Sequence, residues 1–195
     1  MTKPTSRRLR ADAETNTERI LAAAEDVLAV DPTASLERIG EAAGLTRVTV
    51  HRRFASRQVL LEALSERLNQ RYVSALEQSR AEATSPLLEF RRLTEIVFDL
   101  KVSHRFAMEL TADQDDCRPG LSSEVTAGLE QTFARLRAAG DITARGAEWC
   151  RHVYLAILHE VHELPDDAPD LAGASRAELV VRAVIGALGG TPQQP

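Results

Sequence analysis

The stretch LTRVTVHRRFASR, residues 45–57, gathers cationic side chains in a chain that is acidic as a whole. It contains four arginines, one histidine and no acid, whereas the 195-residue chain has a formal net charge of −5. Guanidinium groups form charge-assisted, forked hydrogen bonds with oxyanions such as phosphate. These residue types therefore predict that one part of the chain binds a polyanion.

The distribution of charge leaves an alternative to polyanion binding. Bases outnumber acids by 13 to 11 in residues 1–80, while acids outnumber bases by 18 to 11 in residues 81–195. A basic patch of this kind also fits a solvated, arginine-rich helix face. The secondary structure expected around the arginines is needed to distinguish the two interpretations.

A second stretch whose side chains could bind a metal or act in catalysis is HEVHE, residues 159–163. Its histidines stand three residues apart, whereas the metalloprotease motif H-E-x-x-H places them four apart. The sequence also lacks a G-x-S-x-G nucleophile and a phosphate-binding glycine loop. We therefore expect no catalytic residue, no metal and no cofactor. The alternative is an all-helical enzyme or metal-binding protein that uses the acidic and histidine cluster His159–Asp167.

Two short helices are expected around the basic stretch, at residues 36–43 and 47–54. Ser35 and Thr46 precede them and are suited to accept hydrogen bonds from the first free amides. Gly44 ends the first helix because glycine accepts the left-handed backbone conformation. Together they form a helix-turn-helix, whose second helix can lie in the major groove of double-stranded DNA.

Helical periodicity extends over most of the chain, with no strand alternation and no repeat. Beyond residue 80, helices are expected at 86–100, 103–112, 121–139, 143–163 and 175–188. No run approaches about 18 consecutive apolar residues, so no membrane span is expected. The N-terminus has no apolar segment of the secretory type, and Cys117 and Cys150 lie far apart, which together favour a cytoplasmic protein with reduced thiols.

A pattern of apolar, small and capping residues runs through residues 17–64. It comprises Ile20-Leu21, Ala23-Ala24, Ile39-Gly40, Ala43-Gly44, Thr46, Phe54, Ser56 and Arg57. This pattern resembles the N-terminal domain of TetR-type transcriptional regulators. The chain departs from the family at His51, where tyrosine is usual, and at Arg57, where lysine is usual.

The resemblance implies an all-α fold. It consists of an N-terminal three-helix helix-turn-helix DNA-binding domain followed by a larger helical ligand-binding and dimerisation domain. The expected divisions are a flexible basic arm at 1–14, the DNA-binding domain at 15–57 with a connecting helix at about 57–79, and the C-terminal domain at 80–190. The implied function is a ligand-responsive, sequence-specific regulator, a repressor released from its operator by a small molecule. It implies no enzyme activity.

The expected DNA contacts fall on the second short helix and its surroundings. Arg47 and Arg52 are expected to read bases, because arginine makes bidentate contacts with guanine in the major groove. His51, Arg53 and Arg57 are expected to hold phosphates. The full set of expected DNA-binding residues is Ser35, Thr46, Arg47, Val48, Thr49, His51, Arg52, Arg53 and Arg57.

The C-terminal helices are expected to hold the dimer contact and the effector. The family implies a homodimer through the last two helices, which would read a pseudo-palindromic operator. Apolar residues suited to this role, or to an ordinary core, are Leu179, Val180, Ala183, Val184 and Ala187, with Val153, Ala156, Ile157 and Leu164. The effector is an unidentified small molecule, and its candidate pocket residues are Phe98, Phe106, Trp149 and His152. A third interpretation is a helical interaction module whose arginines meet an acidic partner or RNA.

Overall fold

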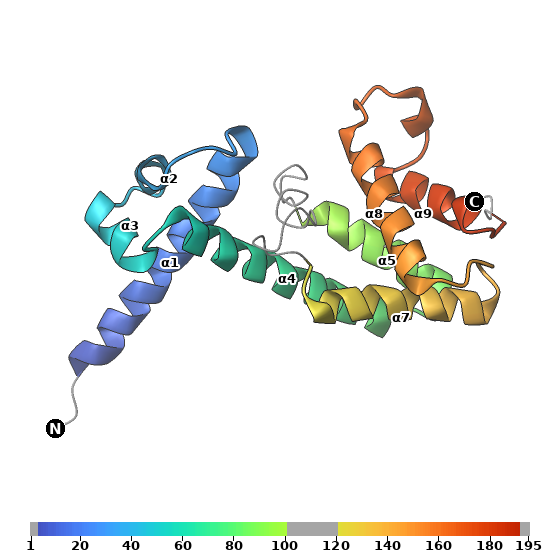
Figure 1. The fold of residues 1–195 in the computed structure, drawn as a ribbon, viewed down its shortest axis with the longest axis horizontal. Coiled ribbons are helices and arrows are strands. Elements are labelled where there is room, and N and C mark those ends of the chain that lie inside the picture. The colour runs from blue at the N-terminus through green and yellow to red at the C-terminus, as the bar shows by residue number, and fades with distance from the viewer. Residues whose placement is uncertain (1–3, 101–120, 192–195) are drawn as a thin grey trace. The chain divides into compact units, whose positions relative to one another are not determined.

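The computed structural model describes residues 4–100 and 121–191, and their side chains from residue 14 onward. Every regular element in these ranges is helical, which confirms the predicted fold class (Figure 1). The elements are α1 (Pro4–Val30), α2 (Leu36–Ala42), α3 (Arg47–Arg53), α4 (Arg57–Glu82), α5 (Pro86–Asp99), α7 (Ser123–Ala139), α8 (Ala147–Glu163), a 3-10 turn (Pro169–Leu171) and α9 (Arg176–Ala187). The helix expected at 103–112, with Phe106, lies outside the described residues.

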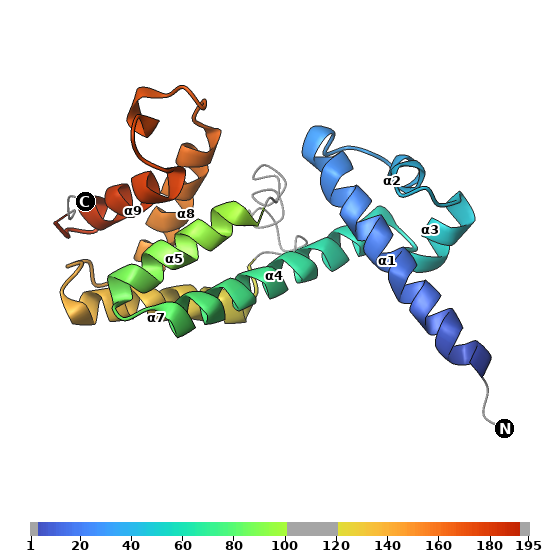
Figure 2. The same cartoon turned by 180° about the vertical axis from the view of Figure 1, so that it is seen from behind.

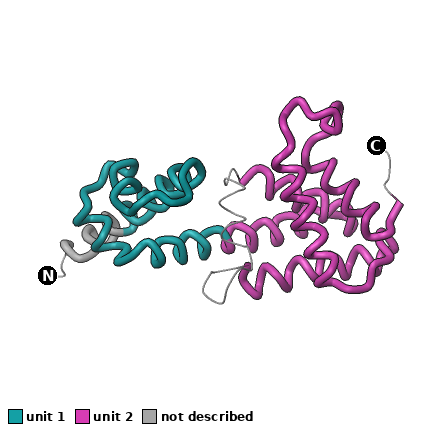
Figure 3. The backbone as a smooth tube through the Cα atoms, turned by 45° about the horizontal axis from the view of Figure 1, so that its top comes forward, with its two compact units in different colours: residues 1–68, 102–120 teal, residues 69–101, 121–195 magenta. Residues whose placement is uncertain are grey.

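The described chain forms two compact units, coloured separately in Figure 3. The first includes residues 1–68 and the second includes residues 69–101 and 121–195, so the division falls within α4. The sequence predicted that the second domain begins at residue 80, after the end of the connecting helix.

The first unit is built around one face of α1. Ile20, Ala24 and Leu28 recur every four residues and are buried, as are Ile39 of α2 and Val50 of α3. Burial of such a stripe is the main force that holds short helices together in water. The unit therefore contains the three helices expected from the sequence.

The N-terminal segment corrects one expectation. Residues 1–14 were expected to form a flexible arm, but α1 begins at Pro4 and not at Thr15. Proline is well suited to the first turn of a helix, where its missing amide hydrogen costs nothing. The alanines, arginines and glutamate that follow have high helix propensity, which explains the longer helix.

The second unit packs α5, α7, α8 and α9 together (Figure 2). An aromatic centre lies in the core between them. Phe90, Phe133 and Tyr154 are almost fully buried, and their ring centroids lie 5.3–6.1 Å apart. Beside them, the buried carboxylate of Glu89 accepts hydrogen bonds from Arg135 of α7, one of them from Nε at 3.0 Å. This unit has its own core.

Candidate nucleic-acid interface

The turn between α2 and α3 depends on two glycines. Gly44 has φ +65°, which is the left-handed conformation predicted for the end of the first short helix. Gly40 lets the two helices approach, because a Cβ there would lie 2.7 Å from Cγ2 of Val50. The amide of Leu45 donates to the carbonyl of Gly40 at 2.9 Å and closes the turn.

Both expected caps are confirmed. The Ser35 hydroxyl accepts a hydrogen bond from the amide of Arg38, and the Thr46 hydroxyl accepts one from the amide of Thr49, each at 3.3 Å. These bonds satisfy amides that the first turns of α2 and α3 leave free. The start of α3, and hence the direction of its side chains, is therefore fixed locally.

The helix α3 has one buried face. Val50 has no exposed surface and Phe54, at its C-cap, is 4% exposed. Burying two such side chains contributes roughly 3–6 kcal/mol. Because these residues are four apart, their anchoring turns the other faces of α3 outward.

The outward faces of α3 carry the residues expected to read DNA. Arg47, Val48, His51 and Arg52 are exposed, and Val48 is 78% exposed despite being apolar. Thr49 is half-buried. Among the described residues, Arg52 has no ion-pair partner. An exposed apolar side chain between two arginines suits the surface of a base pair better than it suits water.

Two of the expected phosphate contacts are placed differently. Arg57 lies at the start of α4 and donates to the carbonyls of Pro32 and Ala34, so its guanidinium ties down the loop between α1 and α2. Arg53 is half-buried, and among the described residues its buried Nε has no hydrogen-bond partner. Neither side chain is presented as openly as Arg52.

Glu37, an acid in the first turn of α2, was not among the residues expected at this interface. Its Oε1 lies 3.3 Å from Nε of Arg47 and 3.5 Å from Nε2 of His51. Hydrogen bonds from its own backbone amide and from His51 lower the pKa of Glu37, so the carboxylate is ionised at neutral pH. No run of residue types signals this contact, because it depends on how α2 crosses α3.

The three expected effector residues that the structure describes do not gather in one place. Phe98 is half-buried on α5, and its ring stacks on His162 with centroids 5.9 Å apart. Trp149 is 62% exposed and His152 is also exposed on α8, so both side chains reach solvent in the single chain. Their spacing places them on the face of α8 opposite the buried Tyr154.

A seam of aromatic and polar side chains runs between α5 and α8. Phe90 faces Tyr154 with ring centroids 5.3 Å apart, and two turns further along Phe98 faces His162. Thr94 lies between them on α5, with its hydroxyl donating to the carbonyl of Phe90. The Thr94 hydroxyl is also the neighbour of the buried Tyr154 hydroxyl, which no described residue reaches at full hydrogen-bond geometry. Burial raises the pKa of Tyr154 and lowers that of His162.

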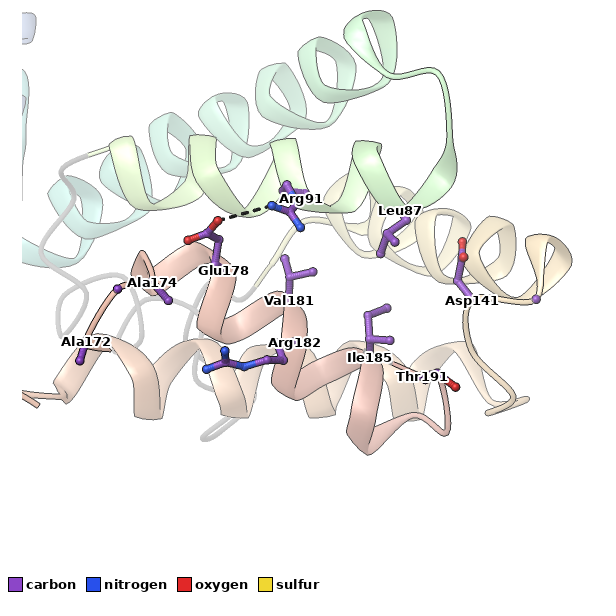
Figure 4. A pocket seen from close by; sticks show the side chains of 12 residues that line it. Leu87, Arg91, Asp141, Ala172, Ala174, Glu178, Val181, Arg182, Ile185 and Thr191 are labelled. Carbon is purple, nitrogen blue, oxygen red and sulfur yellow. Dashed lines mark ion pairs between the residues drawn. The ribbon is translucent and has the colours of Figure 1, made fainter. Parts of the chain in front are cut away.

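A separate groove of about 480 Å³ lies between α5 and α9 (Figure 4). Leu87, Val181 and Ile185 form its apolar wall, and an ion pair between Arg91 and Glu178 spans it at 3.5 Å. Of the expected effector residues, Phe98, Trp149 and His152 are described, and none of these three lines this groove.

Arg176 of α9 binds part of the His159–Asp167 stretch at the end of α8. Arg176 donates to the carbonyls of Val161 and Leu164 at 2.6 and 2.7 Å and pairs with Asp166 at 2.8 Å. Within the ranges that the structure describes, no group of three or more histidine, cysteine or acidic side chains could hold a metal ion. No described helix is long and apolar enough to cross a bilayer.

The apolar stripes of α8 and α9 divide between two faces. Val180 and Val184 are fully buried within the unit, whereas Ala187 of α9 and Ala156 of α8 are exposed. The exposed indole of Trp149 extends the same outer region of α8. The core and the expected dimer surface therefore use different members of the predicted stripe.

Comparisons with known proteins agree with this geometry. The family model for bacterial regulatory proteins of the tetR family matches residues 20–64. The HTH-type transcriptional repressor LfrR of Mycolicibacterium smegmatis is 34% identical over 167 residues, which cover 84% of this chain and 86% of LfrR.

Solved structures with the same fold include that of the TetR-like regulator LfrR from Mycobacterium smegmatis in complex with proflavine. It superposes with a TM-score of 0.65 and 30% identity over 90% of this chain and 96% of LfrR. SmeT, the repressor of the Stenotrophomonas maltophilia multidrug efflux pump SmeDEF, superposes with a TM-score of 0.62 over 92% of this chain and 96% of SmeT. At 21% identity, that likeness concerns the fold.

Proposed function

Because the chain belongs to the TetR family of bacterial regulatory proteins, we propose that it is a cytoplasmic repressor that binds a pseudo-palindromic operator and is released by a small molecule. The observation that carries this proposal is α3, a capped helix anchored by Val50 and Phe54 with its cationic side outward. Residues 15–57 would form the DNA-binding part, and residues 80–190 would bind the effector and the second copy.

At the operator, Arg47 and Arg52 would contact guanines, and Val48 would contact a thymine methyl group. Each bidentate arginine contact is worth about 1–3 kcal/mol of discrimination. His51 would hold a phosphate, as would amides at the start of α4. Arg57 would act chiefly through the loop that it holds, because two backbone carbonyls already occupy its guanidinium.

Binding to the DNA upstream of the protein's own gene over a salt series tests this proposal. We expect specific binding that weakens steeply as salt rises, because phosphate contacts release counterions. Arg52→Ala should relax the sequence preference, and Arg57→Ala should lower stability more than preference. Equal affinity for every duplex would contradict the proposal and favour the interaction-module alternative.

We propose that the effector is a flat aromatic molecule that binds along the seam between α5 and α8. The stacked pair of Phe98 and His162 presents parallel ring faces, and Tyr154 offers a hydroxyl with hydrogen-bonding capacity to spare. The proflavine complex of LfrR supports this class of ligand. The lowered pKa of His162 keeps its ring neutral at pH 7, so the seam does not repel a cation there.

Release of operator DNA by proflavine, used as the probe, tests the effector site. Tyr154→Phe should raise the proflavine concentration needed for release about three- to tenfold, the worth of one hydrogen bond. Arg91→Gln is the matched control, because it alters the groove between α5 and α9 and leaves the seam intact. A response that changes with Arg91→Gln and not with Tyr154→Phe would place the effector in the groove.

A further inference from the structure

The carboxylate of Glu37 shares its Oε1 between two residues of α3. Arg47 and His51 are four apart and therefore stand on one side of that helix. Their side chains are 73% and 39% exposed and that of Glu37 is 42% exposed, so all three reach solvent. Exposed pairs of this kind contribute little to stability, which leaves their effect on DNA as the more important consequence.

The ion pair engages one particular atom of Arg47. Glu37 lies against Nε at 3.3 Å, which leaves the two terminal nitrogens of the guanidinium for another partner. Those two nitrogens are the pair that can bridge O6 and N7 of a guanine. The contact thus holds the guanidinium from behind while its outer edge stays open.

The negative charge of Glu37 also acts on every DNA sequence alike. A phosphate that approaches Arg47 or His51 must compete with the carboxylate that already contacts them. A base edge that fits the open side of Arg47 does not face this competition. The same residue should therefore weaken non-specific binding and favour binding to the correct sequence.

We propose that Glu37 is a positioning residue for Arg47 that sets the sequence discrimination of α3. The inference rests on the proposed DNA-binding function. Glu37 itself touches no base in this scheme and acts through the guanidinium that it orients.

The test compares full-length variants on two duplexes, one selected by the wild type from a randomised pool and one with the same bases scrambled. Glu37→Ala should lower the affinity ratio between the two at least about fivefold, the lower limit for one bidentate contact. It should also steepen the salt dependence of scrambled-DNA binding by up to about 0.9, as expected when one more cation meets a phosphate. Glu37→Gln, which keeps an oxygen beside Nε of Arg47 but removes the charge, should keep more of the ratio than Glu37→Ala does.

Two controls isolate the mechanism. Glu41→Ala removes another exposed acid of α2 and should leave the ratio unchanged. In an Arg47→Ala background, Glu37→Ala should cause no further loss of the ratio. The inference would be overturned if Glu37→Ala left the affinity ratio unchanged, or if Glu37→Gln or Glu41→Ala lowered it as much as Glu37→Ala does. It would also be overturned if Glu37→Ala lowered the ratio by the same factor in the Arg47→Ala background. A wild type that selects no sequence would instead refute the proposed function and the inference with it.

Discussion

Gly40 shows how one missing side chain shapes the DNA-binding face. A Cβ at this position would meet Cγ2 of Val50 at 2.7 Å, and Val50 is fully buried and stiff about χ1. We expect Gly40→Ala to destabilise the chain by about 1–2 kcal/mol, because the clash exceeds the gain in helix propensity. Urea unfolding monitored by circular dichroism measures the loss.

The matched background for Gly40→Ala is Val50→Ala, which removes the opposing methyl groups. There the alanine at 40 should be neutral or stabilising, since only its helix propensity remains. An equal cost of Gly40→Ala in both backgrounds would mean that the close approach of α2 to α3 is not its cause.

Single residues also mark the limit of what the sequence could predict. The basic side of α3 was found because arginine chemistry is visible in residue types, and Val48 and Arg52 do project outward. The contact of Glu37 with Arg47 and the loop contacts of Arg57 were not found. Both join residues on different helices or loops, so they depend on packing geometry that local patterns do not contain.

At the scale of elements, Thr46 decides where α3 begins. Its hydroxyl accepts from the amide of Thr49 at 3.3 Å, and no acid in the first turn of α3 shares this task. We expect Thr46→Ala to cost about 0.5–2 kcal/mol of stability and to weaken operator binding, whereas Thr46→Ser should retain most of both. Thermal unfolding and binding to the upstream DNA provide the two measurements; a serine variant as poor as alanine would contradict the capping argument.

Helix ends with a local signal were predictable, and those set by tertiary contacts were not. The starts of α2 and α3 follow their capping residues, and Ser175 caps α9 in the same way. The start of α8 was expected at 143 but lies at Ala147, because the amides of Thr143 and Ala144 donate to the carbonyl of Leu188. That carbonyl lies at the end of another helix, so no periodicity in residues 140–147 announces it.

The alkaline limit of the whole molecule depends on its two tyrosines, Tyr72 and Tyr154. Burial raises the pKa of Tyr72 to about 12 and raises that of Tyr154 as well, from an ordinary 10.0. Each folded tyrosine thus keeps its proton above pH 10 while the unfolded chain loses it. The tyrosines should leave stability unaffected below pH 10 and should lower it above pH 10, by at most about 1.4 kcal/mol per pH unit for each tyrosine.

Replacing both tyrosines by phenylalanine tests this pH dependence. Urea midpoints measured from pH 9 to 11.5 should fall less steeply for the double variant than for the wild type. Cys150, whose pKa is also raised by burial, remains in both proteins and cancels in the comparison. If the urea midpoints of the two proteins fell equally steeply with pH, the tyrosine hydroxyls would ionise as readily in the folded state as in the unfolded chain.

Assembly of two copies should be visible through Trp149, the single tryptophan of the chain. Its side chain is 62% exposed in one copy and lies on the outer side of α8 with the exposed Ala156. If α8 and α9 form the homodimer contact, the indole becomes buried as the protein concentration rises, and its fluorescence emission shifts to shorter wavelength. The sedimenting mass should double over the same concentration range.

Ala156→Arg should weaken dimerisation at least tenfold, since a buried unpaired charge is costly at an interface. Ala127→Arg, on an exposed position of α7, is the matched control and should leave both signals unchanged. A chain that doubles in mass while its emission stays constant would place the dimer contact on another surface.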